Sequence, residues 1–312
     1  MRRAVEMDPS SLRRGSEDPI ETLKRELRGK AEVRRPDESD EPILGNAVRA
    51  AILGWLAEIR AADVLAEVGL KPRNTALFYG PPGCGKTTMA HHLAARLGVP
   101  MVLVGPENII SSGWGDAERA LTKLFDALEA VDIPCVLFLD EAESLGGRRD
   151  KNTGGSADNA RTSLLGVLLR RLEAYSGFAV AATNRHEDID PALWRRFHLQ
   201  VPIDLPGHDE RFAILRRYGQ PFDWTDEDLD LIADLTAGAS PALLRGVMEG
   251  IKRSLVLGKR IGADVSDPVS VFSRVLVAIQ PPPEIEAPDL WQHSGAVGRL
   301  SALKWPPARM GE

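Results

Sequence analysis

Short apolar runs alternate along this chain with longer segments whose apolar residues recur at helical spacing. The runs lie at residues 75–79, 101–104, 135–139 and 178–182, and a further short strand is expected at 198–201. Continuous apolar runs of this length are typical of strands that are buried on both faces. Because strands alternate with helices, the pattern predicts an α/β fold with a mostly parallel sheet and helices on both of its faces.

After Pro206 the pattern predicts helices and no further strand. Residues 208–218, 225–236, 240–257 and 269–279 carry apolar side chains at helical spacing. Several of these segments begin with residues that favour a helix start, such as Thr225. The second part of the chain is therefore expected to form a small helical domain.

The N-terminal 42 residues are rich in Arg, Glu, Asp, Ser and Pro and poor in large apolar groups. Such a composition predicts a charged, flexible arm, because it offers little surface to bury. One short helix is expected at residues 20–27, where Ile20, Leu23 and Leu27 share a face. The alternative is a segment that contacts an adaptor or another subunit.

The C-terminal tail, residues 281–312, is Pro-rich and is expected to be irregular. Its Trp291 and Trp305 are expected to pin the tail onto its own domain rather than to bind a partner. The predicted domains are the arm 1–42, the α/β core 43–206, the helical domain 207–280 and the tail 281–312.

The sequence GPPGCGKT at residues 80–87 stands between the first strand and the helix after it. In this context GxxxxGK[ST] marks a nucleotide-triphosphate site. The glycines let successive N–H groups turn toward a phosphate, and the positive end of the helix dipole points to the same place. Lys86 adds a charge for the outer phosphates, and the Thr87 hydroxyl can ligate Mg²⁺. The residues expected to bind ATP are Pro82, Gly83, Cys84, Gly85, Lys86, Thr87 and Thr88.

A second motif, CVLFLDEAESL, places two carboxylates at the end of the third strand. Asp140 ends a buried strand beside the phosphate loop, where it can hold Mg²⁺ together with Thr87. Glu141 is then placed to orient and deprotonate a water for in-line attack on the γ-phosphate. Together the two motifs predict ATP hydrolysis.

Two further polar elements follow later strands. Asn184 ends the run AVAATN, where it is either a turn residue or, beside the other motifs, a group that positions the attacking water. Arg195 and Arg196 directly follow the turn DPAL. Paired arginines are usually solvated, but a guanidinium is also suited to bind the phosphate oxygens of the transition state. All three residues are therefore candidate catalytic residues.

In this order, GPPGCGKTT, LFLDEAESL, AATN and DPALWRRF resemble the motifs of the AAA family of ATPases, over roughly residues 43–257. The resemblance implies a P-loop three-layer sandwich with a parallel five-stranded sheet in the order 5-1-4-3-2, followed by a small C-terminal helical lid. It also implies a homo-oligomeric ring, usually a hexamer, with ATP and Mg²⁺ between subunits. Arg195 and Arg196 match the arginine fingers that reach into the neighbouring subunit's site in this family.

The sequence departs from the family pattern at three places. The two arginines are adjacent instead of separated, which leaves open which one is the finger, and His198 replaces a common aspartate. The pore-loop trio of relatives that thread polypeptides is here Gly113-Trp114-Gly115. Trp114 is expected to lie on a flexible loop as a pore residue; the alternative is a Trp packed on the neighbouring helix. Arg245 is a candidate lid residue that senses the γ-phosphate.

Charge and cysteine content limit the class of protein. The net charge of −6 gives no global basic field for bulk nucleic-acid binding. Cys84 and Cys135 have no metal-ligand neighbours and are expected to be reduced thiols. The N-terminus has no apolar signal segment, and no run approaches the length of a membrane span. A cytoplasmic protein without a membrane partner is expected.

Together these features predict an ATP-hydrolysing ring that remodels or unfolds protein clients, threading them past Trp114. An adaptor or a separate protease is an expected partner. The chain contains neither of the protease motifs HExxH and GxSxG, so any proteolysis would need a second protein. The alternative is a nucleic-acid-associated ATPase of the loader or transposition-helper type. Its basic face would use Arg148, Arg149, Lys151, Arg170 and Arg171. A scaffold that binds nucleotide without hydrolysing it conflicts with the intact Lys86 and Glu141.

Overall fold

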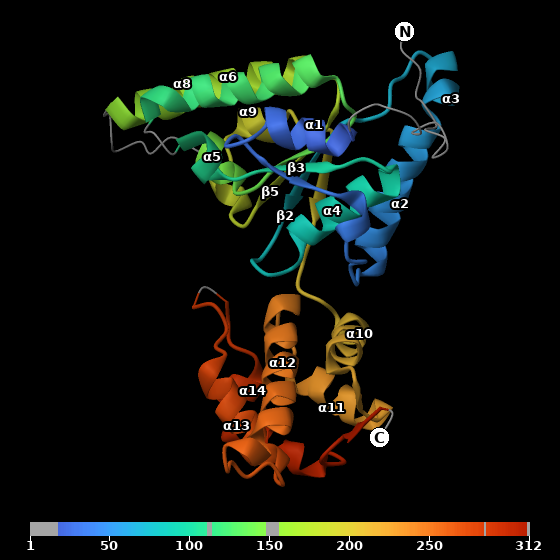
Figure 1. Ribbon diagram of the computed structural model, residues 1–312, viewed down its shortest axis with the longest axis vertical. Helices are drawn as coiled ribbons and strands as arrows, with labels where there is room; N and C mark the ends of the chain where they lie inside the picture. The colour runs from blue at the N-terminus through green and yellow to red at the C-terminus, as the bar shows by residue number, and fades with distance from the viewer. Residues whose placement is uncertain (1–17, 111–113, 148–155, 284, 311–312) are drawn as a thin grey trace. The chain divides into compact units, whose positions relative to one another are not determined.

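The computed structural model describes residues 18–110, 114–147, 156–283 and 285–310, and these divide into two compact units (Figure 1). Unit 1 takes the residues up to Pro42 together with Ala47–Gly80 and Lys86–Pro202. Unit 2 takes Ile43–Asn46, Pro81–Gly85 and the residues from Ile203 on.

A six-stranded sheet forms the centre of unit 1, with the strand order β1-β3-β4-β5-β2-β6. The strands are β1 (Glu32–Arg34), β2 (Thr75–Tyr79), β3 (Met101–Val104), β4 (Val136–Leu139), β5 (Phe178–Thr183) and β6 (Leu199–Pro202). The last five pair in parallel, in the order that the resemblance implies, whereas β1 pairs antiparallel with β3. The α/β fold class is confirmed, and the sheet has one strand more than expected.

Helices cover both faces of this sheet. They are α1 (Pro19–Glu26), α2 (Asn46–Arg60), α3 (Ala62–Glu67), α4 (Lys86–Leu97), α5 (Pro106–Ile110), α6 (Trp114–Val131), α7 (Ala142–Gly146), α8 (Ser156–Ala174) and α9 (Pro191–Trp194). In Figure 1, α1, α6 and α8 lie on one side of the sheet and α2 and α4 on the other. Adjacent residues of one strand, such as Leu77 and Phe78, are therefore both fully buried. This two-sided cover explains the continuous apolar runs.

The N-terminal segment differs from the expected flexible arm. The predicted helix is present as α1, with the Asp18 side chain accepting a hydrogen bond from the Ile20 N–H at 3.0 Å. Leu23 and Leu27 are fully buried in the core of unit 1. Strand β1 then follows, and the Arg35 carbonyl oxygen lies 2.7 Å from His91 Nε2 on α4. Residues 18–42 are thus part of the folded unit, while residues 1–17 lie outside the described part of the chain.

The predicted helices of the second domain are all present in unit 2. They are α10 (His208–Gly219), α11 (Asp226–Leu235), α12 (Pro241–Leu257) and α13 (Pro268–Ala278). Side chains cap three of these helices, since Thr225, Ser240 and Asp267 each accept a hydrogen bond from the first helical turn. Two short strands, β7 (Phe222–Asp223) and β8 (Ala308–Arg309), pair antiparallel, so the expectation of helices alone was wrong.

The C-terminal tail is ordered against the same unit and is less irregular than expected. It contains α14 (Asp289–Gln292) and α15 (Ser294–Arg299) as well as β8. Trp291 Nε1 donates to the Ile279 carbonyl oxygen, and Trp305 Nε1 donates to that of Val265, both at 2.8 Å. These bonds confirm that the two tryptophans pin the tail onto its own domain. None of the helices in the described residues is long and apolar enough to span a bilayer.

Candidate nucleotide-binding and hydrolysis site

The glycine-rich loop joins the buried strand β2 to helix α4. Gly80, Gly83 and Gly85 have φ values of 145°, 75° and 89°, a backbone region that residues with a side chain rarely adopt. The loop can therefore turn sharply at three points between Tyr79 and Lys86. Glycines at such φ values allow backbone N–H groups to turn toward a phosphate, and the 12-residue helix α4 follows the loop directly.

Lys86 begins α4 and is only 7% exposed. Its ammonium group Nζ donates a hydrogen bond to the Gly80 carbonyl oxygen at 2.7 Å, so the positive charge lies against the start of the loop. A buried ammonium is stabilised by anionic or strongly polar partners. Lys86 is thus placed to bind the outer phosphates of a nucleotide in this loop.

Thr87 and Asp140 lie together although 53 positions separate them in the sequence. The Thr87 hydroxyl Oγ1 donates to Asp140 Oδ2 at 3.2 Å. Asp140 directly follows β4, and its backbone N–H donates to the Val104 carbonyl oxygen at 2.9 Å, which holds the residue at the carboxyl edge of the sheet. A hydroxyl and a carboxylate are hard oxygen ligands, so this pair fits Mg²⁺.

Glu141 adopts an unusual backbone conformation next to this pair. Its φ of 47° and ψ of 50° lie in the left-handed region, which residues other than glycine rarely adopt. Its N–H donates to Asp140 Oδ1 at 3.0 Å, while its side chain is exposed. Strained backbone of this kind clusters at functional sites. The exposed carboxylate is available to a water molecule, as a general base requires.

Asn184 follows β5, which pairs directly with β2. The Gly80 N–H donates to the Thr183 carbonyl oxygen at 3.3 Å, so the end of β5 is bonded to the first residue of the phosphate loop. Thr183 Oγ1 also accepts a hydrogen bond from the Arg185 N–H, which fixes the turn after the strand. The exposed Asn184 thus directly follows the residue that is bonded to Gly80, and its role in positioning water remains a prediction.

Arg195 and Arg196 are exposed and directly follow α9. Arg195 Nε donates to the Pro191 carbonyl oxygen at 3.1 Å, and Arg196 Nη2 lies 3.4 Å from Glu173 Oε2. Among the described residues, neither guanidinium forms an ion pair with Asp140 or Glu141. Their roles as arginine fingers therefore remain predictions.

Arg245 is held on the surface of α12 within unit 2. Its Nε donates to Glu249 Oε1 at 2.7 Å, and its guanidinium lies 5.3 Å from the centre of the Tyr218 ring. The hydrogen bond from Arg245, followed by smaller effects of Arg253, lowers the pKa of the Glu249 carboxyl. Its role as a γ-phosphate sensor remains a prediction.

Trp114 begins helix α6, so Trp114 and Gly115 are helical rather than part of a loop. Residues 111–113 and the Trp114 side chain lie outside the described part of the chain. The expectation that Trp114 lies on a loop was therefore wrong. Its role as a pore residue remains a prediction.

The basic group proposed for nucleic-acid binding is partly engaged within the chain. Arg171 lies 2.7 Å from Asp126 Oδ1 and 3.9 Å from Glu129 Oε1, so its charge is already compensated. Arg170 is exposed. Arg148, Arg149 and Lys151 lie outside the described part of the chain.

Neither cysteine forms a disulfide and both are buried, Cys84 within the phosphate loop and Cys135 just before β4. Burial raises the pKa of the Cys135 thiol to about 11, while the Tyr175 hydroxyl at 3.7 Å has a smaller opposite effect. A buried thiol with a raised pKa is a poor nucleophile. Cys135 is thus a core residue.

A hollow of about 340 Å³ lies beside the phosphate-loop helix and was not predicted from the sequence. Its walls come from α4 and from the N-terminal segment, namely Glu32, Arg34, Glu38, Asp40, Thr88 and His91. Because residues 1–42 were expected to form a flexible arm, their place in the wall of this hollow was not predicted. Thr88 was expected at the site from its place after Thr87, whereas no pattern pointed to the segment that faces it.

Comparison with known proteins places this geometry in a family. Residues 76–205 match the model of the "ATPase family associated with various cellular activities (AAA)". The matched segment contains the phosphate loop, Asp140, Glu141, Asn184 and both arginines.

Two of the similar sequences are a nucleotidase and a cell division cycle protein homolog. A proteasome-activating nucleotidase from Thermococcus gammatolerans is 31% identical over 241 residues, which cover 72% of this chain and 59% of the relative. A cell division cycle protein 48 homolog from Archaeoglobus fulgidus is 28% identical over 319 residues, which cover 93% of this chain and 42% of the relative. The chain thus spans little more than half of the length of the first relative and less than half of the second.

A solved structure supports the same fold. The AAA domain of FIGL-1, crystallised in complex with ADP, superposes with a TM-score of 0.65 at 21% identity and covers 85% of this chain and 92% of that domain. At this identity the comparison establishes the fold alone.

Proposed function

We propose that this chain, which belongs to the AAA family of ATPases through its residues 76–205, binds ATP and hydrolyses it to ADP and phosphate. The observation that carries the proposal is the contact between Thr87 Oγ1 and Asp140 Oδ2 at 3.2 Å, beside the buried Lys86. It joins the phosphate loop to the carboxylates at the end of β4. The ADP bound to the FIGL-1 AAA domain supports a nucleotide ligand of this kind.

In this mechanism the backbone N–H groups of residues 82–88 and the Lys86 ammonium bind the phosphates. Thr87 and Asp140 would hold Mg²⁺, which would neutralise phosphate charge when bound. Glu141 accepts a proton from a water that Asn184 orients, and the water oxygen bonds to the γ-phosphorus while the bond to the bridging oxygen breaks. ADP is the leaving group.

Replacing Lys86 by alanine is expected to abolish ATP binding, because the loop loses the one mobile charge that reaches the outer phosphates. Binding of a fluorescent ATP analogue by the purified chain measures this loss. Lys71→Ala is the matched control, since Lys71 is an exposed lysine ahead of β2. The assignment fails if Lys86→Ala binds ATP as tightly as Lys71→Ala does.

The active form is proposed to be a homo-oligomeric ring, with a hexamer as the expected size. Each unit carries exposed large apolar side chains that a second copy could cover: Leu53, Val64, Val68 and Leu70 in unit 1, and Val256, Leu257, Ile261 and Val277 in unit 2. The surface position of Arg195 and Arg196 supports the same proposal, because a finger arginine acts on a neighbouring subunit.

The clients are proposed to be proteins that the ring unfolds or remodels. Support comes from the names of the similar sequences, a nucleotidase that activates the proteasome and a cell division cycle protein 48 homolog. An adaptor and a separate protease are the proposed partners. The free state of Cys84 and Cys135 supports the proposed cytoplasmic location.

A nucleic-acid-associated ATPase is the competing function. The ion pairs of Arg171 with Asp126 and Glu129 remove one member of its basic group. The two functions are distinguished by adding DNA or an unfolded protein to the ATPase assay. Stimulation by DNA alone would favour the competing function.

Replacing Trp114 by alanine is expected to leave basal ATP turnover nearly unchanged and to abolish client unfolding, because a pore aromatic grips the client and not the nucleotide. Loss of fluorescence from a fluorescent protein with an unstructured tail measures unfolding. Trp114→Tyr, which keeps an aromatic ring, is expected to retain activity. A large fall in melting temperature together with loss of assembly would instead identify Trp114 as a structural residue.

A further inference from the structure

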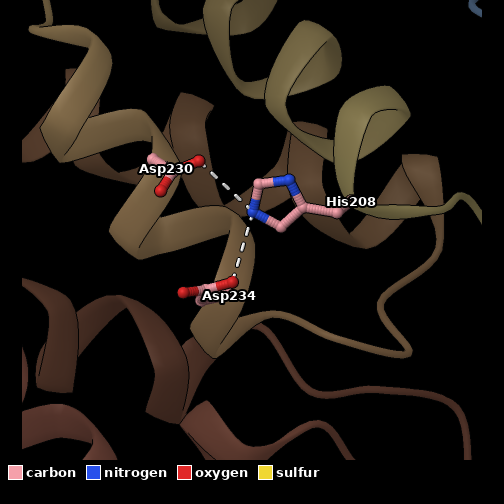
Figure 2. A group of neighbouring side chains, drawn as sticks. All are labelled: His208, Asp230 and Asp234. Carbon is pink, nitrogen blue, oxygen red and sulfur yellow. Dashed lines mark ion pairs between the residues drawn. The ribbon is translucent and has the colours of Figure 1, made fainter.

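A group of three metal-ligating side chains lies on unit 2 and includes none of the residues proposed for ATP hydrolysis. His208 is the first residue of α10, and Asp230 and Asp234 lie one turn apart on α11. Figure 2 shows the Nε2 atom of His208 facing both carboxylates. The distances from Nε2 are 3.4 Å to Asp230 Oδ1 and 3.2 Å to Asp234 Oδ1, and the three ligand atoms all lie within 4.8 Å of one another.

We propose that His208, Asp230 and Asp234 form a zinc site. Zn²⁺ is bound by imidazole nitrogen and carboxylate oxygen at distances of about 2.0–2.2 Å, and tetrahedral geometry then places neighbouring ligand atoms about 3.3 Å apart. Both measured distances from Nε2 agree with that spacing. The distance between the two aspartate oxygens can shorten by rotation of both side chains, because each is more than half exposed. A water molecule completes the four ligands.

The local charges favour a cation at this place. Two carboxylates one helical turn apart repel each other, and a cation between them removes that cost. Arg211 is the nearest guanidinium on α10, but its Nε and Nη1 donate to the carbonyl oxygens of Ala233 and Pro206 at 2.9 and 2.8 Å. Within the described ranges, Arg211 forms no ion pair with either aspartate.

The second ring nitrogen of His208 also has a carboxylate near it. His208 Nδ1 lies 3.8 Å from Asp209 Oδ1. A ligating histidine commonly donates its other N–H to a carboxylate, which orients the ring and raises its basicity. At 3.8 Å the two atoms are too far apart for a hydrogen bond, so this support requires the exposed Asp209 side chain to move toward Nδ1, which leaves Nε2 for the metal.

A zinc ion at this site would add a metal link between two helices that are already joined by packing, by ion pairs and by the hydrogen bond from Arg211 to the Ala233 carbonyl oxygen. Its ligands come from the first residue of α10 and from the middle and end of α11, so ligation fixes the two helices relative to each other. The competing occupant of Nε2 is a proton, since an imidazolium between two carboxylates satisfies the same distances. A test must therefore separate metal binding from an ion pair.

The test is titration of the full chain with Zn²⁺ alone, after removal of metals by a chelator, in excess Mg²⁺ that occupies the Thr87–Asp140 pair. One zinc ion is expected to bind per chain. His208→Ala and Asp234→Asn are each expected to weaken binding at least about tenfold. Glu227→Gln is the matched control, because Glu227 is exposed on the same helix α11 and outside the group.

A second measurement keeps the test independent of activity and of folding. Zn²⁺ is expected to raise the melting temperature of the wild type and of Glu227→Gln but not of His208→Ala or Asp234→Asn. Co²⁺ bound in place of Zn²⁺ is expected to give visible absorption bands in the first two proteins alone. The zinc site is refuted if the wild type binds Zn²⁺ no more tightly than Asp234→Asn, in which case the group is an ion pair only.

Discussion

Replacing Glu141 by glutamine is expected to lower ATP turnover by about 10²–10⁴, the usual contribution of a general base, while ATP binding persists. Glutamine keeps the shape of the side chain but cannot accept the proton of the attacking water. The phosphate-binding groups, with Lys86 at their centre, are unchanged, so nucleotide affinity should remain close to that of the wild type. Steady-state phosphate release and binding of a fluorescent ATP analogue measure the two quantities.

The control for this variant is Glu67→Gln, which removes an exposed carboxylate on α3. Turnover by Glu67→Gln should equal that of the wild type. If Glu141→Gln hydrolyses ATP near the wild-type rate, Glu141 is not the general base. Because the variant holds ATP without turning it over, affinity capture with it is also expected to trap the client protein.

Replacing both Arg195 and Arg196 by alanine is expected to lower ATP turnover by about 10³–10⁵, the contribution of an arginine finger in related phosphoryl transfer. ATP binding should be unaffected, because the phosphate loop and Lys86, which are proposed to bind the nucleotide, are unchanged. The single variants show which arginine carries the effect. Glu173→Gln removes the side chain nearest to the Arg196 guanidinium and shows whether this ion pair restrains it.

Mixing two inactive variants tests whether the site is shared. A subunit that lacks both arginines still has Lys86, and a Lys86→Ala subunit still has both arginines. Mixed rings should therefore recover part of the turnover, at sites where the first kind of subunit binds ATP and the second supplies the arginine. The shared site is excluded if mixing restores no activity and the chain stays monomeric in saturating ATP.

Local sequence was sufficient to predict the phosphate loop and the helices of both units that the sequence analysis named. Strand β2, the glycines at positive φ and helix α4 follow one another within 23 residues, and each needs only its own side chains and backbone geometry. The order of the motifs then placed the carboxylates and Asn184 at strand ends. In a parallel sheet the carboxyl ends of neighbouring strands meet at one edge, so that placement needed no coordinates.

Strand β1 shows what local sequence could not indicate. Its three residues, Glu32–Arg34, include two charged side chains, and none of the three is buried. The strand exists because its backbone pairs with β3, some 70 positions further along the chain. Backbone N–H and C=O groups form these hydrogen bonds, and nearly every residue carries both groups. No pattern of side chains therefore predicts them.

The amphipathic face of α1 was visible in the sequence, but its place in the fold was not. Spacing alone puts Leu23 and Leu27 on one side of a helix. The tertiary structure shows that this side is buried in the core of unit 1, so the segment that was expected to be an arm is part of the folded unit.

The same division applies to the two candidate sites. Thr87 and Asp140, and likewise His208 and Asp234, are distant in the sequence and lie within 3.2 Å in space. The motifs of the phosphate site identified the first pair in advance, because the family pattern specifies both residues. The second pair has no motif. It arises because α10 and α11 pack together, and packing depends on the apolar faces of both helices rather than on the polar residues that it brings into contact.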